Sequence, residues 1–187
     1  MDIDVPVMLK AVAGKPLGRF EPFVTADPAA VEAFYRKTLA RLGSRRGVAV
    51  LREMDHYGSG YASYISAFLY PRDGSSQVDH PEYVETVGVL LYLSRLAPMA
   101  VFGASGRTDS KRDTGCGSGF ITVDNLNQLP PGDWSDFIGT VESSLREDLV
   151  EVLPREPLLA AAPSDIKIPS VFDGPYCVFD TLFYWLD

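Results

Sequence analysis

The feature that most constrains this chain is its longest apolar run, Val87 to Leu93, near the middle of the sequence. The run consists of valine, leucine and tyrosine around one glycine, which is typical of a strand covered on both faces. A second apolar segment, Met99 to Phe102, follows Pro98. Because proline cannot donate to a sheet ladder, Pro98 belongs at a corner between two strands. The stretch therefore predicts a strand, a tight corner and a second strand.

The same region also fits a helix. Asp79 is a suitable N-cap, with Pro81 in the first turn and Glu82 three residues on. A helix over residues 81–96 would be apolar nearly all round and hence central and buried. Gly88 and the valine content favour the strand, and the helix remains the alternative at this point. The apolar run is shorter than the ~18 residues of a membrane-spanning helix, so no membrane span is expected.

Elements on the N-terminal side have simpler patterns. Ile3 to Val12 begins with alternating apolar residues and is expected to form a first strand. An Asp-Pro pair precedes a helical pattern over residues 28–42, which predicts a capped helix. Val48 to Met54 and Tyr61 to Tyr70 have strand character and a glycine-containing connection, which predicts an antiparallel hairpin.

The C-terminal half alternates between polar and apolar segments. Residues 104–119 offer little apolar surface to offset their ordering entropy, so a mobile loop is expected there. Asp133 is placed to cap a second helix that runs to about Asp148. The aromatic end of the chain, residues 176–187, has helical spacing and is expected to dock on the core. These patterns predict a single α+β domain over residues 1–187, with a largely antiparallel sheet packed against two main helices.

Composition excludes some classes of function. The chain has 25 acidic and 17 basic residues, a net charge of −8, so a nucleic-acid binder with a basic face is not expected. An acidic surface fits both solubility and a basic protein partner. Cys116 and Cys177 have no metal-ligand or redox spacing. Asp2 and Asp4 stand where a secretory signal would be basic, so a cytoplasmic location is expected.

Few residues point to catalysis. His80 lies in sequence among Asp79, Glu82 and Glu85, where a carboxylate-oriented histidine can act as a general base and the patch can take a hard cation. An exposed loop or helix start explains the same residues. The glycine-rich sequence around Cys116 lacks the strand before it and the helix after it that a phosphate-binding loop needs. No catalytic residue, metal ligand or cofactor is therefore assigned.

Two strings, YLSRLAPMAVFG at residues 92–103 and VFDTLFYWLD at residues 178–187, resemble segments of uncharacterised bacterial proteins. Those proteins are similar to immunity proteins, which neutralise a toxin made beside them. The resemblance covers about the second half of the chain and carries over no catalytic residue. It implies a binding protein without an active site.

Three hypotheses follow from the sequence. The first is a non-catalytic, cytoplasmic, immunity-type protein, monomer or homodimer, whose acidic surface and aromatic anchors bind a toxin with a basic surface. The residues proposed for that contact are Asp73, Asp79, Glu82, Asp109, Asp113, Tyr184 and Trp185. The alternative is a small hydrolase or metal-dependent enzyme that uses His80 with the neighbouring carboxylates. The third is a ligand-binding or assembly module whose aromatic terminus packs on a second copy.

Overall fold

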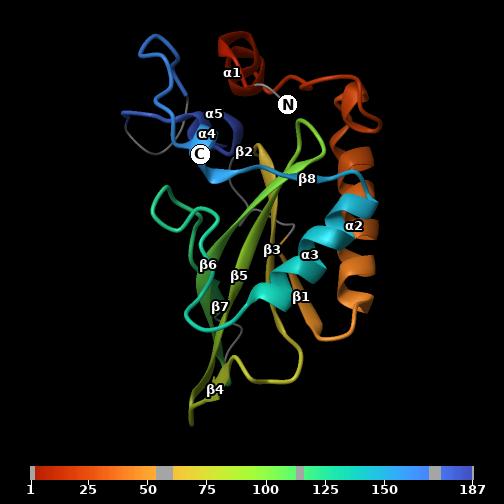
Figure 1. The fold of residues 1–187 in the computed structure, drawn as a ribbon, viewed down its shortest axis with the longest axis vertical. Coiled ribbons are helices and arrows are strands. Elements are labelled where there is room, and N and C mark those ends of the chain that lie inside the picture. The colour runs from red at the N-terminus through yellow and green to blue at the C-terminus, as the bar shows by residue number, and fades with distance from the viewer. Residues whose placement is uncertain (1–2, 54–60, 113–115, 169–173, 187) are drawn as a thin grey trace.

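A computed structural model describes residues 3–53, 61–112, 116–168 and 174–186, and every structural statement below concerns these ranges (Figure 1). The helices are α1 Val5–Val12, the short 3-10 helix η1 Phe23–Thr25, α2 Pro28–Ser44, α3 Ser135–Glu147, α4 Arg155–Leu158 and α5 Val178–Leu182. The strands are β1 Val48–Glu53, β2 Tyr61–Ala62, β3 Tyr64–Pro71, β4 Gln77–Asp79, β5 Tyr83–Ser94, β6 Met99–Ser110, β7 Cys116–Ser118, β8 Glu151–Val152 and β9 Trp185–Leu186.

Seven of the strands form one mostly antiparallel sheet. Its main path is β1-β3-β5-β6-β7, while β4 also pairs with β5, and β8 pairs with β6 as the one parallel neighbour on this sheet. The short strands β2 and β9 form a second, two-stranded sheet. Together with α2 and α3 packed against the large sheet, this confirms a single α+β domain with two main helices.

The central hairpin β5–β6 is the predicted strand, corner and strand. Residues 83–94 are therefore a strand, and the alternative of a helix over residues 81–96 was wrong. Its register runs from Tyr83 opposite Ser110 to Leu93 opposite Ala100, and Pro98 lies in the corner. Leu90 and Leu91 point to opposite faces and both are fully buried. Burial on both faces explains why this sequence shows no polar alternation.

Two apolar clusters cover the two faces of the sheet. On one face α2 and α3 pack on a cluster that includes Ile65 of β3 and Leu91 of β5. On the other face α1, α4 and α5 pack on a cluster that includes Phe68 and Leu90. In Figure 1, α1, α4, α5 and both chain termini lie at the end of the molecule opposite β4. Two buried faces place the strands at the centre of the fold.

The first segment of the chain is a helix, so the prediction of a strand over Ile3 to Val12 was wrong. Asp4 is the N-cap, and its Oδ1 accepts a hydrogen bond from the Val7 backbone N at 2.9 Å. Pro6 fits the first turn, where a missing N–H costs nothing. Met8 and Ala11, three residues apart, are the buried pair of this helix. The alternation at its start is too short to distinguish a strand from one helical turn.

The prediction of a mobile loop over residues 104–119 was wrong for residues 104–110 and 116–118, which are strands, whereas residues 113–115 lie outside the described residues. Strand β6 continues to Ser110 and pairs with β5 all along that length, and β7 then pairs with β6. The polar composition of this segment suggested a loop. A strand forms nevertheless, because pairing with the long strand β5 satisfies the backbone N–H and C=O groups of β6 without apolar burial. The outer parts of this hairpin, with β4 and β7 beside them, extend beyond the helices and are called the hairpin arm below; its described residues are 77–87, 106–112 and 116–118 (Figure 1).

Candidate functional site

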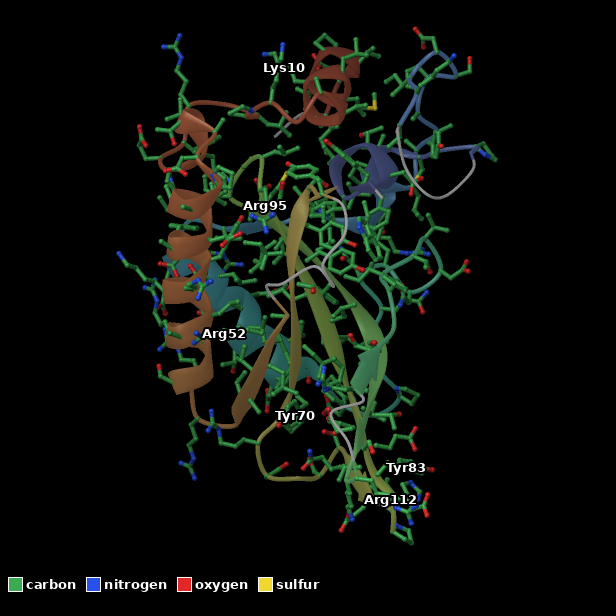
Figure 2. All side chains as sticks on the ribbon, turned by 180° about the vertical axis from the view of Figure 1, so that it is seen from behind. Lys10, Arg52, Tyr70, Tyr83, Arg95 and Arg112 are labelled. Carbon is green, nitrogen blue, oxygen red and sulfur yellow. The ribbon has the colours of Figure 1, made fainter. Side chains whose placement is uncertain are left out.

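Most of the acidic residues proposed for partner binding lie on the hairpin arm, and two of them at its tip form ion pairs. The Asp79 carboxylate pairs with the Lys111 ammonium group. The Glu82 carboxylate lies 2.6 Å from the Arg112 guanidinium group. Figure 2 shows Tyr83 and Arg112 at this tip, at the opposite end of the molecule from Lys10 on α1. Asp79 and Glu82 at the tip are therefore each balanced by a neighbouring cation.

The remaining acidic candidates are also engaged. The Asp109 carboxylate lies 2.8 Å from the Arg107 guanidinium group within β6. The Asp73 side chain, in the turn after β3, accepts a hydrogen bond from the Ser75 backbone N at 2.9 Å. Hydrogen bonds from Ser75 lower the pKa of Asp73. Asp113 lies outside the described residues. Each described acidic candidate thus has an ion-pair or hydrogen-bond partner of its own.

His80 lies on the same exposed arm. Its ring stacks on Tyr83 with centroids 4.3 Å apart, and its Nε2 lies 3.7 Å from the Glu85 carboxylate, beyond hydrogen-bond reach. Lys111 donates to the His80 carbonyl oxygen at 2.7 Å. Within the described ranges, no group of three or more His, Cys, Asp or Glu side chains has the arrangement of a metal site.

The two cysteines lie in different parts of the fold. The backbone of Cys116 begins β7, and its side chain is outside the described part of the structure. Cys177 is a half-buried free thiol that precedes α5, and burial raises the pKa of this thiol. A raised pKa reduces the thiolate fraction and hence nucleophilicity at neutral pH.

The two aromatic candidates at the C-terminus have different environments. Tyr184 is 4% exposed, and its hydroxyl donates to the Ala11 carbonyl oxygen at 2.9 Å. Its backbone N donates to Ser63 Oγ at 2.9 Å. Burial raises the pKa of Tyr184 to about 12. Tyr184 thus joins the end of the chain to α1 and to Ser63 between β2 and β3, whereas Trp185 at the start of β9 is only half-buried. Docking of this terminus on the core is confirmed.

A pocket of about 260 Å³ lies beside this terminus, between the sheet, α5 and the segment after β7. Eight of its thirteen lining residues are aromatic, and Asp180 is the one charged residue among them. Tyr64 and Tyr92, from the neighbouring strands β3 and β5, stack in its wall with centroids 3.9 Å apart. Phe120 and Trp185 face each other across 6.0 Å between centroids. Sequence reasoning missed this pocket because its aromatic residues come from four separate segments.

The polar groups of this aromatic pocket are few. The Tyr92 hydroxyl accepts a hydrogen bond from the Ile121 backbone N at 3.2 Å, which fixes the segment after β7 against the sheet. Asp180 Oδ2 accepts from the Cys177 backbone N at 2.8 Å. The Trp185 Nε1 atom is buried and has no hydrogen-bond partner among the described residues. An indole N–H without a partner in a buried position is uncommon in folded proteins.

Charge is divided very unevenly along the chain. Residues 1–112 contain 12 acidic and 14 basic residues, whereas residues 113–187 contain 13 acidic and only three basic ones. The whole negative net charge therefore comes from the later part, which forms β7, α3, β8, α4, α5 and β9. This signal can be read from the sequence by comparing the two parts, and the overall net charge conceals it.

Several carboxylates of this later part have no cation beside them. Asp136 and Glu142 of α3, and Glu156 and Asp165 near α4, form no ion pair within the described ranges, and all but Glu142 are exposed. Where α3 meets α2 the carboxylates are paired, because Arg41 pairs with Asp148 and Arg45 with Glu147 there. The later part therefore carries several carboxylates without a neighbouring cation, as well as an excess of acidic residues in its sequence.

Comparison of the chain with protein-family models, curated protein sequences and solved structures finds no match. The resemblance to immunity proteins therefore stays a prediction. Over the described residues, the helices are all too short or too polar to cross a membrane.

Proposed function

We propose that this protein is a non-catalytic binding protein of the immunity type, which neutralises a toxin by covering a basic surface of it. The observation that carries the proposal is the uneven division of charge, with 13 acidic and three basic residues in residues 113–187. Carboxylates without neighbouring cations create a negative field that extends into solvent, whereas paired ones cancel at short range. Such a field accelerates encounter with a basic partner.

In this proposal the negative field that steers the partner comes from the anionic later part, whose helices α3 and α4 lie on opposite faces of the sheet, rather than from the hairpin arm. In the later part the carboxylates Glu142, Glu156 and Asp165 are unpaired in the described ranges, while Asp79, Glu82 and Asp109 each have a cation beside them. An unpaired surface carboxylate can gain a partner's Lys or Arg without first losing an internal one. The acidic residues first proposed from sequence therefore take a secondary place.

The alternative of a hydrolase or metal-dependent enzyme finds less support in the geometry. It requires His80 and its acidic neighbours to converge on a substrate or an ion. Asp79 instead pairs with Lys111 and Glu82 with Arg112, on side chains that are 75% and 61% exposed. A general base needs its partner groups within hydrogen-bond reach of a bound substrate.

The first test is co-expression with the product of the adjacent gene in a bacterial host. The proposal expects that product to inhibit growth alone and growth to recover when this chain is present. Absence of both toxicity relief and complex formation would refute it.

The second test locates the source of this field with two matched triple variants, each of which removes three negative charges. Glu142→Gln, Glu156→Gln and Asp165→Asn together should lower the association rate by on the order of tenfold at low salt. The control is Asp79→Asn, Glu82→Gln and Asp109→Asn, which should leave that rate within about twofold. Stopped-flow measurements across ionic strengths compare them. Equal loss in both variants would place the contact elsewhere.

A further inference from the structure

The proposed function gives no role to the aromatic pocket, although its lining residues are of an unusual kind. Its walls are rings from β3, β5, α5, β9 and the segment after β7, and its one charged lining residue is Asp180. The geometry points to a binding site for a small organic cation with a methylated or quaternary ammonium group. This ligand would be bound by the protein independently of any protein partner.

Ring chemistry favours a cation over an anion or a neutral molecule. The faces of Tyr, Phe and Trp carry negative potential, so an ammonium group within about 6 Å of a ring centroid is attracted. A methylated ammonium is also weakly hydrated and presents apolar surface, which suits walls that are mostly carbon. A neutral apolar ligand would gain the contact area without the electrostatic attraction.

Asp180 supplies the charge that such a ligand needs. The residue is half-buried at the pocket, its Oδ2 accepts from the Cys177 backbone N at 2.8 Å, and it forms no ion pair within the described ranges. The surrounding residues 113–187 add further negative charge. A carboxylate in a partly desolvated site attracts a cation more strongly than one in open water. An anionic ligand would be repelled both by Asp180 and by the negative charge of residues 113–187.

Size and access agree with a small ligand. The pocket volume of about 260 Å³ lies below the ~300–1,000 Å³ of sites for drug-sized molecules. Phe120, Thr122 and Val123 at its edge are exposed, so the pocket opens to solvent. Choline is small, carries one trimethylammonium group and is therefore a suitable probe.

The experiment titrates the full chain, labelled with ¹⁵N, with choline and follows the two indole N–H signals by NMR. Trp185 lines the pocket, whereas Trp134 donates its indole N–H to the Pro131 carbonyl oxygen at 3.2 Å and serves as an internal control. We expect a saturable shift of the Trp185 signal and no shift of the Trp134 signal. The neutral isostere 3,3-dimethyl-1-butanol should bind about tenfold more weakly.

A charge variant separates electrostatic recognition from shape. Asp180→Asn keeps an oxygen that can accept from the Cys177 backbone N, so the local fold is preserved, and it should weaken choline binding about tenfold. The control Asp136→Asn removes an exposed carboxylate of α3, in the same part of the chain but outside this pocket, and should leave the affinity unchanged. Equal affinity for choline and its neutral isostere, no effect of Asp180→Asn, or no saturable shift of Trp185 would each overturn the assignment.

Discussion

Gly88, in the middle of β5, offers a sharp test of the packing between the central strands. A Cβ added there would lie 2.7 Å from Phe68 Cζ and still closer to the Leu69 backbone oxygen. Ordinary carbon contacts lie at about 3.5–4.0 Å, so β3 or the Phe68 ring must move by about 1 Å. Overpacking of this kind costs about 1–3 kcal/mol. The reduced entropy of the unfolded chain returns about 0.4–1 kcal/mol, so Gly88→Ala should destabilise the fold by about 1–2 kcal/mol.

Gly106→Ala is the matched control, because it makes the same change in the neighbouring strand β6 where no atom lies within 4 Å of the added Cβ. That variant should be neutral or gain up to about 1 kcal/mol. Urea unfolding followed by circular dichroism measures both, and Gly88→Ala should lower the midpoint by about 0.5–1 M at an unchanged slope. If Gly88→Ala is as stable as Gly106→Ala, the close approach of β5 to β3 is wrong.

Two further predictions concern buried tyrosines. Tyr35→Phe removes a hydroxyl that donates to the carbonyl oxygens of Ser94 at 2.7 Å and Ala97 at 3.2 Å, so the unfolding free energy should fall by about 1 kcal/mol. Thermal melting measures this, with the exposed Tyr83→Phe as the control; an equal effect in both would contradict the role of these bonds. Burial raises the pKa of Tyr184 from 10.0 to about 12, so stability that is complete below pH 10 should decline between pH 10 and 12 as the unfolded chain ionises. Tyr184→Phe should flatten that decline in urea midpoints measured against pH, and an unchanged decline would show that other groups cause it.

Local patterns predicted the elements whose stabilising contacts lie close in the chain. The helix at residues 28–42 was predicted within two residues of α2, because Asp27 caps it through the Ala29 backbone N and Pro28 occupies its first position. The antiparallel pairing of Val48 to Met54 with Tyr61 to Tyr70 was also confirmed for β1 and β3. The uneven charge of residues 1–112 and 113–187 can also be read from the sequence, provided that the two parts are counted separately.

The elements and the site that were missed depend on distant neighbours. The polar segment after Gly103 becomes a strand because β5 offers it a complete row of backbone partners, which no local pattern reports. The pairing of Asp79 with Lys111 depends on the register of the hairpin arm, which brings residues 32 positions apart to one tip.

The aromatic pocket shows most clearly which features depend on sequence and which on tertiary structure. The sequence determined that the chain is rich in aromatic residues and that its later part is anionic. Tertiary structure alone decided that Tyr64, Tyr92, Phe120 and Trp185 surround one cavity and that Asp180 lies beside it. Composition sets how much apolar surface must be buried, but only packing decides which rings meet and where they leave a space.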